Sequence, residues 1–354
     1  MTAATHPDDI KATPRPRSEE RPPSGGWRII AQKELADHIG SVRFFVVFFV
    51  LGLAGVAAIY SVSQQLTSVA SLFTGGQSVF PYLFTLSASD VANATQQASA
   101  STPLPPFVTL VAWLAPLFGI SFGFDAVNRE RSDRTLPRLL AQPIYRDDVI
   151  NGKFVAGLAA IAIALGAILL IIIAWGVIQL GVIPTAEDVA RLFIWYVFTV
   201  VYIGFWLALA TLFSVVLRRA ASSALVAIAI WLVFSLFGGL LISTLVGLIA
   251  PLGSSPTQAS VLANGHLTDA LTRISPDGMF QLATQALLNP HLTSSIMTTD
   301  QLVAAGQQGA LGSSILSIDQ SLLIVGQQLL VLVTLTIVTF ALAYTAFMRQ
   351  EVRA

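Results

Sequence analysis

Residues 154–180 read FVAGLAAIAIALGAILLIIIAWGVIQL, a run of 27 residues without a charged side chain. A helix that crosses the hydrocarbon core of a bilayer needs about 20 consecutive, mostly apolar residues. Because the bilayer offers no water to backbone polar groups, such a segment satisfies them best as a helix. The run therefore predicts a transmembrane helix.

Five further apolar runs lie on either side of this one. The six predicted spans make the chain an all-α polytopic membrane protein, and the other five cover about 44–62, 107–127, 192–217, 220–242 and 322–348. The fifth run stays apolar as far as Pro251 and contains Gly238-Gly239. We expect a helix to about residue 242, followed by a turn or a partly re-entrant stretch. One tilted helix of about 30 residues is the alternative.

The overall composition excludes a soluble enzyme. Hydrophobic residues make up 55% of the 354 residues and charged residues only 11%, against about 25% charged in a soluble domain. The chain contains no cysteine, which rules out disulfides and thiol chemistry, and its four histidines are scattered singly. It has no phosphate-binding loop and no nucleophile elbow. We therefore expect no catalytic residue, no metal and no cofactor on this chain, and no nucleic-acid partner.

The segments outside the spans differ in composition. Residues 1–26 hold five prolines and few large apolar residues, which predicts a disordered tail. Residues 27–43 predict an amphipathic helix in the headgroup plane, and 349–354 form the C-terminal end. The two long loops, 63–106 and 252–321, are polar, but helical spacing over 274–289 after Ser275-Pro276 predicts a helix there. That helix either lies on the outer face of the membrane part or forms the wall of an external vestibule.

The distribution of Lys and Arg predicts the orientation. Seventeen of the nineteen lie before the first span, between spans two and three, between spans four and five, or after the last span. Only Arg191 and Arg273 fall on the opposite side. Because cytoplasmic loops carry the excess of positive charge, both termini are expected in the cytoplasm.

The charge-rich loop between spans two and three is the most informative segment. Residues 125–153 read DAVNRERSDRTLPRLLAQPIYRDDVINGK, far longer than the about 2–8 residues that a reversal needs. The i,i+4 pairs Asp125–Arg129 and Glu130–Arg134 predict that span two continues as a helix into the cytoplasm. Pro143 is expected to stop that helix, and Asp147-Asp148 to cap the next one.

This loop also carries an apolar face. Three leucines share one helical face, and three arginines lie opposite: Leu136, Leu139 and Leu140 against Arg131, Arg134 and Arg138. The leucine face predicts docking onto a protein partner. The alternative is a helix that lies on anionic lipid. The acidic residues of the loop favour docking, because they weaken electrostatic adhesion to such lipid.

These residues resemble the ABC-2 type permeases. The order of a basic amphipathic helix, six spans and a loop reading F-D-x-x-x-x-E-R-x-x-x-T-L-x-x-L-L-x-x-P-x-x-R-x-x-x-x-x-G-K is typical of that family. The matching positions are Phe124, Asp125, Glu130, Arg131, Thr135, Leu136, Leu139, Leu140, Pro143, Arg146, Gly152 and Lys153. The stretch from Ser275-Pro276 to Leu287-Leu288-x-Pro290 is similar to the subgroup with the permease of the nitrous-oxide reductase maturation system.

The resemblance implies a set of partners and a location. It implies a homodimer, or a pair of related permeases, in the cell (inner) membrane of a prokaryote, with two cytoplasmic ATPase subunits that bind the ATP and magnesium. The loop would then be the coupling element that enters a groove on the ATPase. The residues implied in ATPase coupling are Glu130, Arg131, Arg134, Thr135, Leu136, Arg138, Leu139, Leu140, Pro143 and Arg146.

The spans are nearly free of charge, which bears on the substrate. Charged residues inside a membrane mark ion and proton pathways, and here Asp125 is explained by pairing with Arg129, while Arg191 at an outer end can snorkel. A secondary carrier or an ion channel is therefore disfavoured. We expect an exporter of an amphipathic, lipidic or peptide substrate. The alternative is a permease that transmits force to an extracytoplasmic partner through residues 252–321, and less favoured is an unrelated carrier or membrane enzyme.

Overall fold

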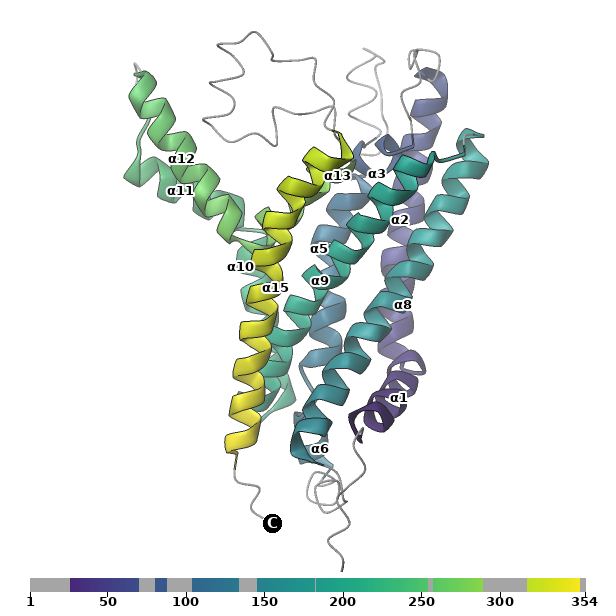
Figure 1. Ribbon diagram of the computed structural model, residues 1–354, viewed down its shortest axis with the longest axis vertical. Coiled ribbons are helices and arrows are strands. Elements are labelled where there is room, and N and C mark those ends of the chain that lie inside the picture. The colour runs from purple at the N-terminus through teal and green to yellow at the C-terminus, as the bar shows by residue number, and fades with distance from the viewer. Residues whose placement is uncertain are drawn as a thin grey trace, which may run out of the picture.

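The structure is a computed structural model that describes residues 26–69, 80–87, 104–133, 145–181, 183–253, 257–288 and 317–350. All regular secondary structure in these ranges is helical, and the long helices stand side by side in one bundle (Figure 1). Five of these helices are long and apolar enough to cross a membrane, and a bent pair makes six if it counts as one span. The prediction of an all-helical membrane protein is confirmed.

The five long spans begin and end at well-defined residues. They are α2 Val42–Val69, α5 Phe107–Gly123, α8 Arg146–Leu180, α9 Ala186–Val216 and α15 Ile318–Arg349. Three of them begin four to eight residues before the apolar run that predicted them. Their first turns contain charged residues, such as Asp147 in α8 and Glu187 in α9, which a hydropathy count leaves out. Asp147 and Asp148 lie in the first turn of α8, and the N-cap residue is Tyr145.

Hydrogen-bonded caps explain two of these early starts. The hydroxyls of Thr185 and Ser317 accept hydrogen bonds from the backbone N–H groups of Asp188 and Gln320. The side chains of Asp188 and Gln320 accept in return from the two cap residues. This reciprocal capping box satisfies donors that would otherwise stay unpaired at the start of a helix.

The helix that was expected to continue from span two into the cytoplasm is interrupted. α5 ends at Gly123, residues 124–127 form a turn, and the short helix α6 spans Asn128–Ser132. The buried hydroxyl of Ser214, on α9, accepts hydrogen bonds from the backbone N–H groups of Val127 and Asn128 at 3.0 and 3.2 Å. Because these donors bond to α9 instead of the preceding turn, α6 begins as a separate helix.

The fifth span is bent. α10 Ala220–Ser235 and α11 Gly238–Ile249 meet at 57°, so the alternative of one unbroken tilted helix is wrong. The break falls directly before Gly238-Gly239 and earlier than residue 242. α11 then runs away from the bundle beside α12 Gln258–Ile274, which the sequence did not predict, and α12 leads back to the bundle (Figure 1).

The centre of the bundle is α9, which packs against α5, α8, α10, α13 and α15. Three of its large aromatic side chains, Trp195, Tyr202 and Trp206, are fully buried. The backbones of α5 and α9 approach closely at Gly119, where an added Cβ would lie 2.5 Å from the carbonyl oxygen of Ile203. Small residues at such contacts let membrane helices pack without a gap.

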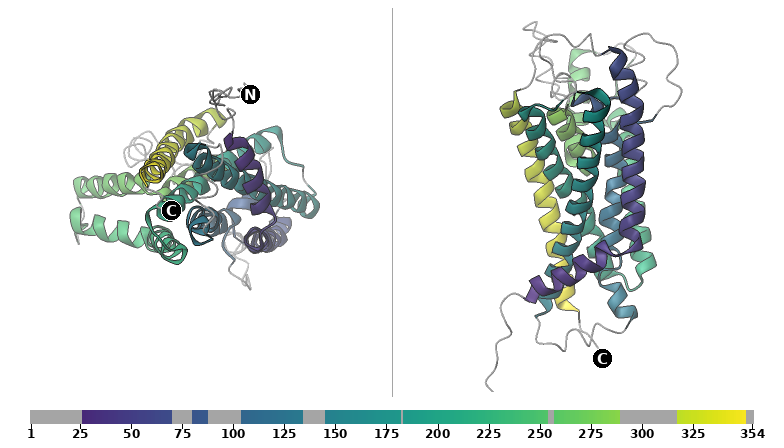
Figure 2. Two further views of the ribbon diagram at one scale, coloured as in Figure 1. Left: turned by 90° about the horizontal axis from the view of Figure 1, so that it is seen from below. Right: turned by 90° about the vertical axis from the view of Figure 1, so that its right-hand side faces the viewer.

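The expected helix over 274–289 is present as α13 Pro276–Leu288, and it is buried inside the bundle's end instead of lying on its face. Its neighbours include α9, α15 and the short helix α3 Tyr82–Thr85. At the opposite end of the bundle, α1 Gly26–Ile39 crosses beneath the spans, and the C-terminal end of α15 lies at the same end (Figure 2). The two ends are called the α1 end and the α13 end below.

Candidate functional site

The predicted coupling segment falls partly outside the described residues. Glu130, Arg131 and Arg146 are described, whereas seven predicted contact residues lie in the range 134–144 that is not: Arg134, Thr135, Leu136, Arg138, Leu139, Leu140 and Pro143. The structure therefore places the two roots of this segment. One root is α6 and the other is the first turn of α8, both at the α1 end.

A buried ionic cluster holds the first root. The Nζ atom of Lys153 lies 3.0 Å from an oxygen of Glu34 and 3.0 Å from an oxygen of Glu130. These side chains are only 8%, 14% and 13% exposed, and they come from α8, α1 and α6. A buried charge is costly unless it is paired, so the three charges constrain each other's positions. We call Glu34, Glu130 and Lys153 the Lys153 cluster.

A glycine allows this cluster to form. A Cβ atom added to Gly152 would lie 2.8 Å from the Cγ2 of Ile30 and 2.9 Å from the carbonyl oxygen of Trp27. Any larger residue would push α1 away from α8 and separate Glu34 from Lys153. Ile30 is buried beside Val149 and Ile150, which fixes the same approach by apolar contact. The Gly152-Lys153 pair of the sequence motif thus acts in helix packing and in ion pairing.

The polar face of α1 also turns toward the bundle. The imidazole of His38 packs on the ring of Phe122, with 4.6 Å between the ring centroids. Burial lowers the pKa of His38, against the nearby Glu34 carboxylate, which raises it. The apolar side chains of Leu35 and Ile39, in the helix predicted to lie in the headgroup plane, pack partly against the core. That α1 also lies in the membrane interface stays a prediction.

Asp125 has a different partner from the one predicted. Its carboxylate lies 2.7 Å from the Nη1 of Arg43, at the start of α2, and not against Arg129. The Arg43 guanidinium also lies over the ring of Phe124, 4.9 Å from its centroid. Arg129 instead lies 4.0 Å from Asp133 at the surface. The turn between α5 and α6 is therefore tied to the start of α2.

A second polar network joins both roots of the segment to the end of α15. Arg131 donates to the carbonyl oxygen of Val215 at 3.1 Å and to the side-chain oxygen of Gln350. Arg146 donates to the backbone oxygen of Gln350 at 3.2 Å, and the Gln350 amide donates to Val215 at 2.7 Å. Arg131 and Arg146 thus bond within the protein in this structure. Their contact with an ATPase stays a prediction.

A cavity of about 850 Å³ opens beside the Lys153 cluster, between α1, α2, α5, α6, α8, α9 and the start of α10. Its wall includes both Glu130 and Lys153, together with further acids and bases such as Asp37 and Arg129. Charges of both signs are mixed along this wall, so it has no preference for one sign of ligand. Within the described ranges, no group of three or more His, Asp or Glu side chains is arranged to hold a metal ion.

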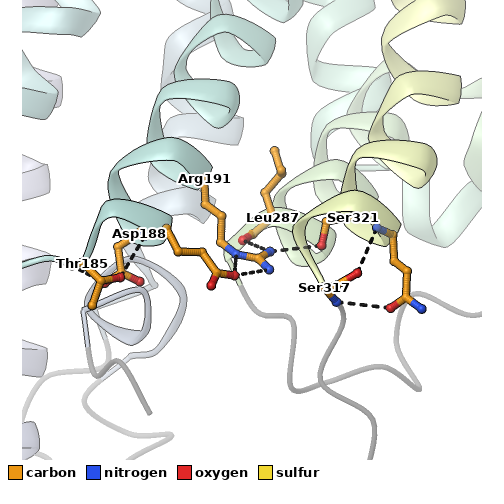
Figure 3. Close-up of polar contacts among 8 residues, drawn as sticks. Thr185, Asp188, Arg191, Leu287, Ser317 and Ser321 are labelled. Carbon is orange, nitrogen blue, oxygen red and sulfur yellow. Dashed lines mark hydrogen bonds and ion pairs between the residues drawn. The ribbon is translucent and has the colours of Figure 1, made fainter. Parts of the chain in front are cut away.

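The α13 end contains a buried arginine that the sequence analysis misjudged. Arg191 was expected to snorkel toward water, but it is only 2% exposed. Figure 3 shows its guanidinium directed at Leu287 and Ser321. It bonds to Glu187 at 2.8 Å, to the carbonyl oxygen of Leu287 at 3.2 Å and to the hydroxyl of Ser321 at 3.0 Å. Arg191 therefore joins α9, α13 and α15, and the partners from α13 and α15 could not be seen from sequence.

The α13 end also contains an acid that the sequence analysis missed. Asp277, in the first turn of α13, is 8% exposed and lines a groove of about 610 Å³. One of its oxygens accepts a hydrogen bond from the side chain of Gln281 at 2.8 Å. Burial raises the pKa of Asp277 to about 6. The sequence placed Asp277 near the start of the helix predicted over 274–289, and nothing in the local pattern marked it as buried.

The fold and the α1 end together define a class of protein. A bundle of membrane-spanning helices, with a charged connecting segment anchored at both roots, is the architecture of a membrane permease. The family model described as "ABC-2 family transporter protein" matches residues 28–352 of this chain. The chain therefore belongs to the ABC-2 transporter family. Comparison with curated proteins gives no significant match, and the nitrous-oxide reductase subgroup stays a prediction.

Proposed function

We propose that this chain is the membrane-spanning permease subunit of an ATP-driven exporter. Membership of the ABC-2 family implies association with ATPase subunits, and the chain itself carries no phosphate-binding loop. The observation that carries the proposal is the Lys153 cluster. It ties α1, α6 and α8 together at the root of the segment that the family resemblance assigns to coupling.

The anchoring of both roots supports a coupling role. A push on residues 134–144 reaches α6 through Arg131 and Glu130, and it reaches α8 through Arg146 and Lys153. The Lys153 cluster prevents α6 and α8 from moving independently, because separating the ions leaves a buried charge unpaired. α6 follows α5 after only a four-residue turn. Movement of the segment would therefore tilt spans two and three together.

The assembly follows from the same proposal. Two copies of the chain, or this chain and a related permease, would bind two cytoplasmic ATPase subunits, which hold ATP and magnesium. The α1 end faces the cytoplasm of a prokaryotic cell, and both termini lie there, because seventeen of nineteen Lys and Arg residues belong to that side. Membrane lipid surrounds the bundle, whose outward side chains, such as Leu323 and Leu330, are apolar and exposed.

Export is the favoured direction, and force transmission is the second candidate. Force transmission to an extracytoplasmic partner requires a surface that the partner can contact. The hairpin of α11 and α12, which extends from the bundle at the α13 end, could provide that surface (Figure 1). This hairpin exposes apolar side chains, among them Leu240, Leu248 and Ile249. A secondary carrier is disfavoured because the family is ATP-linked.

Substitutions on the leucine face test the coupling role. We expect Leu139→Asp and Leu140→Asp to leave membrane insertion intact and to abolish association with the ATPase, because a charge cannot enter an apolar groove unpaired. Gln142→Asp adds the same charge to the same segment at a polar position and serves as the matched control. Association is measured by co-purification in mild detergent. Unchanged association of both leucine variants would remove the docking role.

A further inference from the structure

The groove at the α13 end is bounded by four helices. Its walls come from the end of α10, from α11, from α12 and from the first turns of α13. Apolar side chains form much of the wall, including Phe234, Ile242 and Leu252. The volume of about 610 Å³ lies within the range of small-molecule sites, roughly 300–1,000 Å³.

Among the residues that the structure describes, Asp277 is the one ionisable residue that lines this groove. The other polar groups of the lining are neutral, and several are already engaged, such as Asn264, which donates to the carbonyl oxygen of Ala250 at 2.8 Å. The second oxygen of Asp277, Oδ1, is buried and has no hydrogen-bond partner among the described residues. A carboxylate can accept about four hydrogen bonds, and here Gln281 supplies one. The Oδ1 atom therefore lacks a positive or donating partner among the described residues.

No cation of the neighbouring helices supplies that partner. α10 and α11 contain no ionisable residue. The ionisable residues of the other helices packed against α13 do not line the groove: Tyr82 on α3; Glu187, Asp188, Arg191, Tyr196 and Tyr202 on α9; His266, Asp269 and Arg273 on α12; and Asp319, Tyr344 and Arg349 on α15. Within the described ranges, the groove thus combines a partly apolar wall with a single acidic side chain.

We propose that this groove binds an amphiphile with a protonated amine, whose ammonium group pairs with Asp277 and whose apolar body lies along α10 and α11. The statement that this amphiphile is an exported substrate rests on the export function proposed above. The ammonium supplies the donors that Asp277 lacks and neutralises a buried charge, which strengthens a hydrogen bond in an apolar setting. The amine can come from a membrane lipid headgroup or from a soluble amphiphile.

Photo-crosslinking with a diazirine-bearing alkylamine tests the site in the purified full-length chain, reconstituted in nanodiscs. We expect the amine probe to label peptides that cover 234–281, and the alkyl alcohol of the same length to label them far less. Asp277→Asn, which keeps the size of the side chain, should reduce amine labelling roughly tenfold or more. Asp269→Asn removes one charge from α12 outside the groove and should label like the wild type.

A second variant guards against misfolding of the first. Gly247 lines the groove, and a Cβ added to it would meet no atom within 4 Å. Gly247→Phe should therefore fold and fill the groove, so that labelling falls while Asp277 is retained. Equal labelling of the wild type, Asp277→Asn and Gly247→Phe would overturn the site. Equal labelling by the amine and the alcohol would overturn the ammonium specificity.

The pH dependence gives a further readout. Because burial raises the pKa of Asp277 to about 6, the carboxylate takes up a proton as the pH falls through that value and loses its attraction for a cation. Amine labelling of the wild type should therefore fall between about pH 7 and 5, whereas Asp277→Asn should show a flat profile. A flat wild-type profile would contradict the pairing.

The composition of the nanodisc distinguishes the two sources of the amine. If a lipid headgroup occupies the groove, phosphatidylethanolamine, which carries an amine, should compete with the probe. The wild type and Asp277→Asn should then differ less in labelling in phosphatidylethanolamine nanodiscs than in phosphatidylglycerol nanodiscs. An unchanged difference assigns the groove to a soluble amphiphile. None of these measurements involves an ATPase. A negative labelling result would therefore overturn the groove site without affecting the coupling role. A negative co-purification would overturn the coupling role without affecting the groove site.

Discussion

The two ends of the bundle hold their charges in different ways. At the α1 end, ion pairs run between helices that are distant in sequence: Lys153 to Glu34 and Glu130, and Arg43 to Asp125. At the α13 end, Arg191 pairs with Glu187 one turn away on its own helix. Asp277 has no positive partner among the residues that line its groove.

This difference fits the two roles proposed above, coupling at the α1 end and ligand binding at the α13 end. Interhelical ion pairs make the α1 end resist relative motion, as a force-receiving end should. The α13 end instead contains a bent span, a groove and an acid with an unpartnered oxygen, which suits a ligand. The close packing of α1 on α8 and the hairpin of α11 and α12, which extends away from the spans, lie at opposite ends of the same bundle (Figure 1).

The largest effect is expected from breaking the Lys153 cluster. Lys153→Met removes the buried cation that lies between the carboxylates of Glu34 and Glu130, which should lower the free energy of unfolding by about 3–5 kcal/mol. It should also uncouple ATP hydrolysis from substrate movement. Lys33→Met is the matched control: Lys33 also lies 3.6 Å from Glu34, but its side chain is 68% exposed, so its removal should change the free energy of unfolding little. Thermal unfolding in detergent compares the two variants.

A triple variant separates stability from coupling. Replacing Glu34 and Glu130 by Gln together with Lys153→Met removes all three charges, and it should recover much of the lost stability. Coupling should stay impaired, because the interhelical ion pairs are still absent. Recovery of both properties would show that the cluster has no role beyond stability, and a stable Lys153→Met single variant would contradict its burial.

A smaller effect is expected at the other end. Arg191→Leu leaves the carbonyl oxygen of Leu287 without its donor and should lower the free energy of unfolding by about 2 kcal/mol. Because Arg191 does not bear on the coupling segment, the stoichiometry of bound ATPase should not change. Arg273→Leu, the other arginine of this side, is the control. Loss of the ATPase in Arg191→Leu would break the proposed separation of the two ends.

The smallest effect concerns His38. Burial lowers its pKa below the ordinary value of 6.5, so in the pH range below 6.5 the unfolded chain takes up a proton that the folded chain does not. The free energy of unfolding should therefore fall as the pH drops below 6.5, and the fall should end below the folded-state pKa. His38→Leu should remove this contribution. Identical pH profiles of unfolding for both proteins would contradict it.

The spans could be predicted because length and hydropathy decide them. The apolar run 154–180 became the main part of α8, and the other runs became helices in the same order. The exact starts could not be predicted, because Thr185 and Ser317 cap their helices within polar sequence. The break after Gly123 depends on Ser214, ninety-one residues further along the chain.

The candidate site was predicted less completely, and the reason is long-range pairing. Local spacing paired Asp125 with Arg129, whereas the fold brings Arg43 to Asp125. The motif marked Glu130 and Lys153 but not Glu34, since no pattern within α1 shows that it faces α8. Asp277 was missed because burial depends on neighbouring helices that sequence spacing does not reveal.

The central claim is that the α1 end receives force from an ATPase. The most direct test is affinity purification of the tagged full-length chain in mild detergent, with identification of bound proteins and an assay of ATP hydrolysis. We predict a nucleotide-hydrolysing subunit in equal number with this chain. Purification of the chain alone, under several gentle conditions, would contradict the claim and would favour a carrier that works without ATP.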